Sequence, residues 1–499
     1  MRISQDSGVS VERQGISRPS IIQLGEIIYR IGLMYSVTSK LRICVNSQTP
    51  LVRFMATTEE IEERFGKAPG AIALSSMHEG SDYELTPGGV TRMILPLLKK
   101  MMARGEISEP FWVSLNPSSP EKAFLDGITL VNIHMDPDMM KGYGSVKEAI
   151  WKEVHGIPRT PLSVASLVWS DEFTDFNQYN RLCTETIHKL DKENDFDVFY
   201  IHDFQQLPAG IMLDTLKPKI FRWHIPLDEG TLTQEWRGFL SRYMSRYDAV
   251  IVSSKRYLAT LRKFGYTGCA RHIYPYIDPE VYGVPSRKQM DEFCSRCRLA
   301  DSDKVILVVA RMDPMKGQDK AIEALSIVQR KVPDAKLILA GNGSFSSSKR
   351  GLNLSKGSMW SAELGRLARD LKVEDRVVFT GHLTHGELEA AYSRCDLTLL
   401  PSLKEGFGLV VIESWLYRKP TVVSSHAGIA ELISNGENGI LVNPVSPHAM
   451  ASSLSGLLSD SERRANLGER GFEGSRKCLL NEGLRMESLL LREVTEGTA

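Results

Sequence analysis

The sequence predicts an α/β protein built from two parallel-sheet domains. Short apolar runs that suit buried strands alternate with segments of helical periodicity along most of the 499 residues. This alternation is typical of parallel strands covered by helices on both faces. Two of the runs, 305–310 and 396–401, lead directly into charged or glycine-rich turns. Because ligands bind at the carboxyl edge of such sheets, those turns are the first candidates for a functional site.

The amino-terminal half carries the first group of strands. Apolar runs predict strands at 41–45, 71–74, 111–115, 128–133, 198–201, 219–222 and 249–252. Between the second and third of these, Gly88 and Gly89 precede an apolar helical run that starts near Met93. Two glycines let a backbone approach a ligand closely, although a plain helix cap explains the same pair equally well. A polar connector from Ile277 to about Ser302 predicts the hinge between the domains.

The carboxyl-terminal half repeats the pattern. Its predicted strands are 305–310, 336–340, 376–381, 396–401 and 421–424, and the residues from Ser459 onward are helical in pattern. A chain of 499 residues is expected to form at least two domains. The two groups of strands on either side of the connector therefore predict two separate parallel sheets.

An acidic motif follows the strand run 396–401. Glu405 and Glu413 stand eight positions apart, and apolar residues recur at helical spacing from Leu409. The turn between strand and helix offers free backbone N–H groups, which suit an anion such as phosphate. Carboxylates beside an anion site suit sugar hydroxyls, because each carboxylate is a double acceptor. The two glutamates are equally compatible with ordinary acidic positions at a helix start.

A basic motif follows the strand run 305–310. Arg311 and Lys316 stand five positions apart at the carboxyl end of that run. Two cations at this edge suit a diphosphate, because they neutralise the charge that develops on a leaving phosphate group. A solvated basic turn is the simpler interpretation of the same residues. A basic turn and an acidic glycine turn in one predicted sheet nevertheless favour a sugar carried on a phosphate.

Composition excludes several classes of function. The chain has 61 Lys and Arg against 61 Asp and Glu, so no net positive field favours nucleic acid as a partner. No apolar run approaches the roughly 18 residues that span a bilayer, and the polar start lacks a secretory pattern, so we expect a cytoplasmic protein without a stable membrane anchor. Seven cysteines are sparse and odd in number, which argues against a disulfide framework. No zinc or other metal site is expected.

The two motifs carry a resemblance to a known family. Arg311 with Lys316, and Glu405 with Glu413, match the two signatures of the retaining glycosyltransferases of family 4. That resemblance implies the GT-B fold, in which two Rossmann-like parallel-sheet domains face each other across a cleft. The amino-domain segments 202–206, 221–227 and 246–248 are similar to the branch that contains trehalose glycosyltransferring synthase and trehalose phosphorylase. The single Gly88–Gly89 pair and Pro226 depart from that branch, and they leave the acceptor open.

The resemblance also implies a domain plan. Residues 1–38 are an extension, whose apolar spacing predicts a helix packed on the body of the protein or on the second subunit of a homodimer. Residues 39–290 form the acceptor-side domain, which a helix at 478–495 rejoins. Residues 291–477 form the nucleotide-sugar-binding domain.

Site roles follow from the resemblance as well. The catalytic residues are Glu405, Lys316, Arg311 and His202. Glu413 binds the donor ribose, and further donor contacts come from Gly406, Phe407, Gly408, Leu409, Val410, Gly381, His382, Gly88 and Gly89. The acceptor side consists of Asp203, Arg222, His224 and Asp228. No cofactor is required. Mg²⁺ is expected only as an ion that accompanies the nucleotide diphosphate, and no protein group is expected to bind it.

The expected reaction moves a hexose, most simply glucose, from a nucleoside diphosphate sugar to a small acceptor such as glucose, with retention. No carboxylate pair is placed as in retaining glycosidases, so same-face attack is expected, with the leaving diphosphate helping to take the acceptor's proton. Three alternatives stay open at this stage. They are a trehalose phosphorylase that uses inorganic phosphate, a transferase for another sugar or a lipid acceptor, and a sugar-nucleotide sensor without activity.

Overall fold

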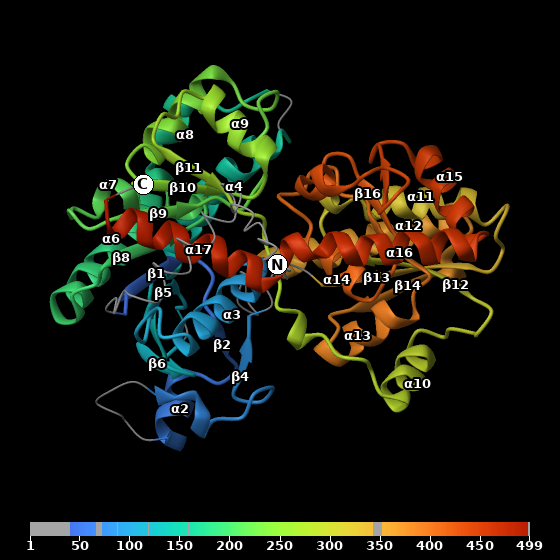
Figure 1. Cartoon of the computed structure of the whole chain (residues 1–499), viewed down its shortest axis with the longest axis horizontal. Coiled ribbons are helices and arrows are strands. Elements are labelled where there is room, and N and C mark those ends of the chain that lie inside the picture. Colours follow the sequence, from blue (N-terminus) through green and yellow to red (C-terminus); the bar gives the residue numbers. More distant parts are fainter. Residues whose placement is uncertain are drawn as a thin grey trace, which may run out of the picture. The chain divides into compact units, whose positions relative to one another are not determined.

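The computed structural model describes residues 40–65, 72–86, 88–117, 119–157, 160–342 and 352–497. The predicted extension 1–38 lies outside these residues. Leu41–Ala499 forms one unit, and it contains two large sheets (Figure 1). Both sheets are almost entirely parallel and covered by helices, which confirms the predicted fold class. No helix among the described residues is long and apolar enough to cross a membrane.

The amino-terminal sheet has nine strands in the order β11-β10-β9-β8-β1-β5-β7-β6-β3. All neighbours pair in parallel except β6 with β7. The strands are β1 (Ile43–Ser47), β3 (Ile72–Ala73), β5 (Phe111–Leu115), β6 (Lys122–Leu125), β7 (Ile128–Ile133), β8 (Val198–His202), β9 (Lys219–Arg222), β10 (Ala249–Val252) and β11 (Cys269–His272). A separate antiparallel pair consists of β2 (Val52–Phe54) and β4 (Tyr83–Leu85).

Alternation along these strands builds two cores, one on each face of the sheet. Phe199, Ile201 and Phe221 pack into one core, whereas Val198, Tyr200 and Ile220 pack into the other, as the two-residue period of a strand requires. The covering helices are α2 (Thr58–Phe65), α3 (Gly89–Ala103), α4 (Pro137–His155), α5 (Val164–Val168), α6 (Asp171–Asn194), α7 (Ala209–Met212), α8 (Gln234–Met244) and α9 (Lys255–Lys263).

The carboxyl-terminal sheet has six parallel strands in the order β14-β13-β12-β15-β16-β17. They are β12 (Lys304–Val309), β13 (Ala335–Ala340), β14 (Val377–Gly381), β15 (Leu397–Leu400), β16 (Thr421–Ser424) and β17 (Ile440–Val442). The helices are α10 (Arg287–Arg296), α11 (Gln318–Val328), α12 (Leu352–Asp370), α13 (His385–Arg394), α14 (Leu409–Leu416), α15 (Pro447–Leu458) and α16 (Ser461–Ser475). The predicted polar connector therefore contains a helix, α10, which a capping box at Ser286 begins and which buries Phe293.

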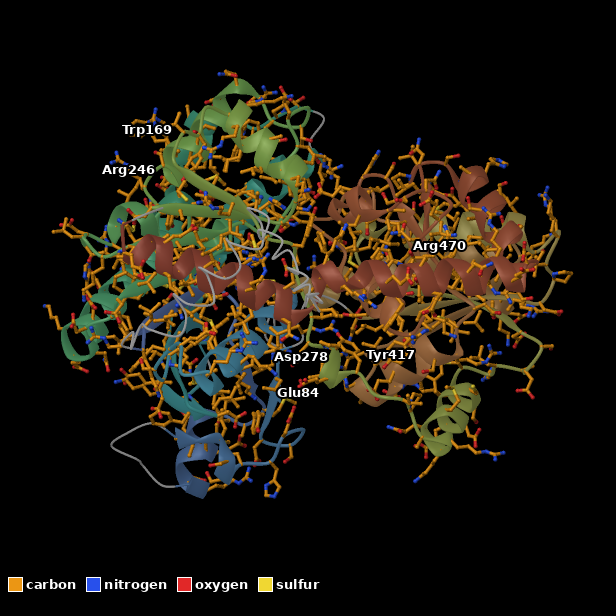
Figure 2. The ribbon with its side chains drawn as sticks, viewed as in Figure 1. Glu84, Trp169, Arg246, Asp278, Tyr417 and Arg470 are labelled. Carbon is orange, nitrogen blue, oxygen red and sulfur yellow. The ribbon has the colours of Figure 1, made fainter. Side chains whose placement is uncertain are left out.

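The chain crosses between the two sheets twice at one place. Ile277 leaves the amino-terminal sheet beside Leu479, and Leu480 N donates to Ile277 O at 2.8 Å. Asp278 (Figure 2) begins a short 3₁₀ turn there by accepting a hydrogen bond from Glu280 N. The last helix, α17 (Leu480–Thr495), then packs against α3 and buries Leu484 and Leu491 in the second amino-terminal core.

Each sheet has one point where the strand order reverses. In the first sheet the chain builds outward from β1 in one direction and then from β8 in the other. In the second sheet the corresponding neighbours are β12 and β15. Ligands of open α/β sheets bind just beyond the carboxyl ends of the strands at such a point, and the predicted charged turns follow β12 and β15.

Candidate active site

The turn after β12 is built to meet the turn after β15. Asp313 accepts a hydrogen bond from Met315 N at 2.8 Å and so begins a tight 3₁₀ turn that ends at Lys316. Gly317 follows with φ of 69°, and a Cβ there would collide with the carbonyl oxygen of Pro401. Only glycine tolerates both conditions. The two turns thus touch through their backbones, and Leu403 N donates to Met315 O at 2.9 Å.

This contact brings the basic and acidic motifs together. Lys316 Nζ lies 2.7 Å from Glu405 Oε2, and the two side chains are 17% and 20% exposed. Burial alone would raise the pKa of Glu405, but the charge of Lys316 and its hydrogen bond, together with the charge of Arg311, hold that pKa below its usual value. Arg311 is exposed and has no ion-pair partner among the described residues. The site therefore holds an ionised carboxylate beside two cations.

Two helix N-termini meet beside this pair. Gly408, with φ of 114°, precedes α14, and Gly88 precedes α3 of the amino-terminal domain. A Cβ on Gly89 would lie 3.9 Å from Leu409 Cδ1, so the two helix starts are in contact range. Neither N-cap residue has a side chain to satisfy the first N–H groups. The positive ends of two helices therefore converge where an anion is expected. The glycine turn does open a helix, and Pro87 lies outside the described residues.

The rest of the acidic turn is held by close backbone contacts. A Cβ on Gly406 would collide with the carbonyl oxygen of His224, so the turn lies directly against the amino-terminal domain. Phe407 is buried, whereas Val410 is partly buried on the first turn of α14. Gly381 ends β14 with φ of 66° and accepts a hydrogen bond from Gly341 N, and His382 follows it. These two residues lie at the same sheet edge, two strands away from β12.

Glu413 is enclosed by protein groups. Its side chain is fully buried, and its Oε1 lies 2.5 Å from Nη2 of Arg92, which projects from α3. Oε1 also accepts a hydrogen bond from Tyr282 at 3.3 Å, and Oε2 accepts one from Tyr392 at 2.7 Å. The carboxylate predicted to bind a ribose therefore has a cation from the opposite domain on it.

Three of the predicted amino-domain residues gather at the carboxyl ends of β8 and β9. His202 Nδ1 lies 3.1 Å from His224 Nε2, and the rings stack at 5.4 Å. Burial lowers the pKa of both histidines well below the usual value, so both are neutral. Asp203 has φ of 70° and ψ of 168°, a conformation that few residues other than glycine adopt. Burial raises the pKa of Asp203 to about 7.

Arg222 differs from its prediction. It was expected beside an acceptor because β9 ends there, and it does pair in register with His202. However, it shares the sheet face of Ile220, which α17 covers, and its guanidinium is fully buried in an ion pair with Glu487. It also donates to Tyr200 Oη and to Ile273 O. The structure therefore places Arg222 in the core rather than at a ligand edge.

Asp228 is the fourth predicted acceptor residue. Its carboxylate lies 3.5 Å from Lys404 Nζ and 3.8 Å from Arg256 Nε, and it is about a quarter exposed. Lys404 also donates to the hydroxyl of Thr231. Asp228 therefore contacts the residue that immediately precedes Glu405 in the sequence.

Sequence reasoning missed two side chains on α4. His155 ends this helix, donates from Nδ1 to Trp151 O at 2.7 Å, and has its pKa lowered to about 3, chiefly by burial, with Lys316 adding to the effect. Lys147, two turns earlier, has its pKa lowered to about 8 by burial and then by the charge of Arg311. Neither residue follows a strand or belongs to a motif, so no local signal indicated them. Arg92, three residues after Gly89, is likewise visible only in the structure.

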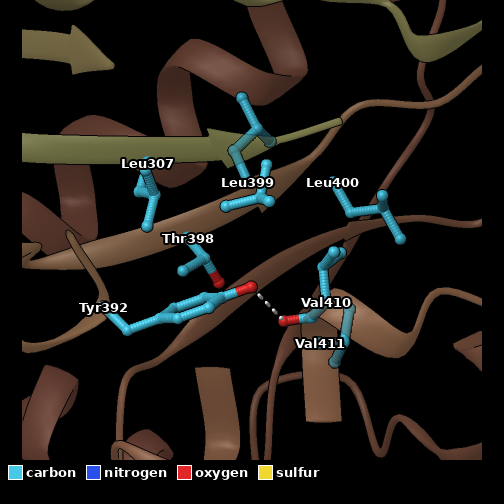
Figure 3. Close-up of a pocket in the computed structure, with 8 residues that line it drawn as sticks. Leu307, Tyr392, Thr398, Leu399, Leu400, Val410 and Val411 are labelled. Carbon is cyan, nitrogen blue, oxygen red and sulfur yellow. Dashed lines mark hydrogen bonds between the residues drawn. The ribbon is translucent and has the colours of Figure 1, made fainter. Parts of the chain in front are cut away.

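A small cavity lies behind the site, between β12, β15 and α14 (Figure 3). Its volume is about 10 Å³, which is room for about one water molecule and not for a sugar. The Tyr392 hydroxyl points toward Val410 O across it, at 3.4 Å. Among the described residues, no cluster of three or more His, Cys, Asp or Glu side chains is arranged to hold a metal ion.

Comparison with known proteins finds a family match in each half of the chain. Residues 291–474 match the family of glycosyl transferases group 1, and residues 165–259 match the trehalose synthase N-terminal domain. The D-inositol 3-phosphate glycosyltransferase of Corynebacterium glutamicum is 30% identical over 206 residues, which are 41% of this chain and 47% of that protein. The trehalose synthase of Thermococcus litoralis is 28% identical over 253 residues, which are 50% and 58%. The chain thus spans about half the length of the curated relatives it matches.

A solved structure shares the fold over nearly the whole chain. Anabaena HepE in complex with UDP and glucose superposes with a TM-score of 0.62 at 18% identity, covering 91% of this chain and all of that one. The chain has the GT-B fold. Its residues 291–474 are similar to the glycosyl transferases of group 1, and its residues 165–259 are similar to the amino-terminal domain of trehalose synthases.

Proposed function

We propose that this protein is a retaining hexosyltransferase that moves glucose from a nucleoside diphosphate sugar to a small acceptor such as glucose. The observation that carries the proposal is the Lys316–Glu405 pair, at 2.7 Å, between the two strands where the sheet order reverses. The match to a trehalose synthase N-terminal domain supports a sugar acceptor. HepE, which was solved with UDP and glucose, supports a nucleotide sugar as the donor.

The donor side would use charge and backbone dipoles. Arg311 and Lys316 would neutralise the diphosphate as the bond from the anomeric carbon to the phosphate oxygen breaks. The N-termini of α14 and α3 add partial positive charge from the opposite side. Glu405 would accept hydrogen bonds from hydroxyls of the donor sugar, and its lowered pKa keeps it ionised for that task. Mg²⁺ carried by the nucleotide is compatible with this arrangement, and we assign no metal ligand to the protein.

The acceptor side would use the amino-terminal domain. The acceptor hydroxyl forms its new bond to the anomeric carbon on the face that the diphosphate leaves, and its proton passes to the departing diphosphate oxygen. His202 is neutral, so it can donate or accept a hydrogen bond to a sugar hydroxyl without carrying charge. Asp203 fixes the backbone beside it by accepting a hydrogen bond from His224 N at 3.3 Å. Contact between the domains would exclude water that otherwise hydrolyses the donor.

A direct assay tests this proposal. The purified protein is incubated with UDP-, ADP- and GDP-glucose, each with and without glucose, and release of the nucleoside diphosphate is measured. We expect glucose-stimulated release that Glu405→Gln abolishes, and NMR of the product should show the same anomeric configuration as the donor. Release that does not respond to glucose would send the search to other acceptors. An inverted product would refute the retaining mechanism.

One observation favours a second candidate. Arg92 and two tyrosines already hold Glu413, whereas Arg311 beside the diphosphate position has no ion-pair partner among the described residues. Inorganic phosphate could bind beside Arg311 without displacing Arg92 from Glu413. A trehalose phosphorylase would then use the same cations. Phosphate-dependent breakdown of trehalose to glucose and glucose 1-phosphate, without turnover of any nucleotide sugar, would establish this function instead.

A further inference from the structure

Glu413, the residue predicted to bind the donor ribose, is surrounded by hydrogen-bond donors of the protein itself. Its two oxygens receive the guanidinium of Arg92, the hydroxyl of Tyr282 and the hydroxyl of Tyr392. These donors come from three separate parts of the chain, namely α3, the segment between the domains, and α13. These three donors take three of the roughly four acceptor positions of the carboxylate, which leaves too few for a ribose diol that donates twice.

Arg92 differs from Tyr392 in its exposure and in the domain to which it belongs. Its side chain is 30% exposed, whereas Glu413 is fully buried. It belongs to the amino-terminal domain and follows the Gly88–Gly89 turn by one helical turn. Tyr392, by contrast, is fully buried within the carboxyl-terminal domain. Arg92 is thus a charged donor from the other domain that a ligand could displace without breaking the core of the nucleotide-binding domain.

We propose that Arg92 is a gate on the nucleoside end of the donor site, which occupies Glu413 until the ribose hydroxyls displace it. This inference rests on the proposed function, because it assumes that a nucleoside reaches Glu413. The gate sets the donor affinity of the protein. A fraction of molecules in which Arg92 has left Glu413 is competent to bind, and the apparent dissociation constant is the intrinsic one divided by that fraction.

The gate also predicts how its removal acts. Without Arg92, Glu413 is a buried carboxylate whose charge is compensated only by two tyrosine hydroxyls, which is a costly state. Ribose hydroxyls would relieve that cost, so the nucleotide should bind more tightly. A ligand that has the diphosphate but no ribose should not sense the change.

Isothermal titration calorimetry tests the gate. UDP, ADP, GDP and inorganic pyrophosphate are each titrated into the wild-type protein, Arg92→Met, Arg92→Lys and Arg271→Met. Arg271 Nη2 lies 3.2 Å from Oε2 of Glu493, which is on α17. The variant Arg271→Met is therefore a matched control that removes another arginine–glutamate pair. We expect Arg92→Met to bind the preferred nucleotide about tenfold more tightly, as for a competent fraction of about one in ten. Pyrophosphate affinity should stay the same, and both other variants should resemble the wild type.

The possible failures are distinguishable. Equal or weaker nucleotide binding by Arg92→Met, with normal binding by the wild type, would overturn the gate and leave the proposed donor site intact. Tighter binding of pyrophosphate and nucleotide alike would also overturn it, because the effect would then not involve the ribose. If pyrophosphate and all three nucleotides fail to bind any of the proteins, the proposed function itself is wrong.

Discussion

Two ion pairs of this protein use the same chemistry in opposite settings. Arg222 and Glu487 are 0% and 1% exposed, and tyrosine hydroxyls and a backbone carbonyl surround them. Lys316 and Glu405 are 17% and 20% exposed and lie at the carboxyl edge of a sheet beside two helix N-termini. The first pair joins the last helix to the amino-terminal sheet. The second keeps contact with solvent, and the proposed function requires it to exchange its partner for a substrate.

Breaking the buried pair should have the largest effect on stability. Arg222→Met leaves Glu487 as a buried, unpaired carboxylate, and we expect a loss of about 3–5 kcal/mol in the free energy of unfolding. Urea denaturation measures it. The double variant Arg222→Met with Glu487→Leu should recover most of the loss, because both charges are then absent. A single variant as stable as the wild type would contradict the structural role of this pair.

Breaking the Lys316–Glu405 pair should instead lower the rate of the reaction. Lys316→Met removes a cation from the diphosphate position, and kcat should fall about 10²- to 10³-fold, as when an electrostatic group of a transition state is removed. The loss of stability should be smaller than for Arg222→Met, because this pair keeps some contact with solvent. Initial-rate kinetics and urea denaturation of the same preparation check both values. A variant that loses stability but retains kcat would reverse the comparison.

A third prediction concerns the pH dependence of stability that the buried His155 beside the site should cause. His155 has its pKa lowered to about 3 from an ordinary value of 6.5, so the folded state keeps it neutral while the unfolded state binds a proton. Below pH 6.5 this favours unfolding, and stability falls by about 1.4 kcal/mol per pH unit for this group. Replacing His155 by glutamine should remove that slope between pH 6.5 and about 4. Parallel pH profiles of the two proteins would show that His155 is not buried neutral.

The smallest effect is expected at an ion pair that is neither buried nor at the site. Arg271 and Glu493 are 40% and 27% exposed, so Arg271→Met should cost about 0–1 kcal/mol of stability and leave kcat unchanged. Thermal denaturation and the glucose-stimulated assay check this. A loss as large as that of Arg222→Met would show that position on α17, rather than burial, determines the strength of these pairs.

Several elements could be predicted from local pattern alone. The strands at 111–115, 128–133, 219–222, 249–252 and 421–424 have the predicted bounds, because each is a short, mostly apolar run that the sheet buries on both faces. The strands β2, β4, β6, β11 and β17 were missed, and local reasons can be given for two of them. β6 forms a hairpin through Asp126 and Gly127, a turn signal that lies in the sequence, whereas β11 is a polar edge strand without an apolar run.

The sequence by itself determined the fold class, most of the strands, and the position of Lys316 and Glu405 after strands of the same sheet. That these two strands, β12 and β15, are neighbours was decided by the tertiary structure. The tertiary structure alone decided which charges are partners. Glu487 lies 265 positions from Arg222, and Glu413 lies more than 300 positions from Arg92. Nothing local in either segment indicates such a partner. Packing of α17 and α3 against the rest of the protein brings these charges together. Each pair forms because a buried charge is costly unless an opposite charge lies beside it.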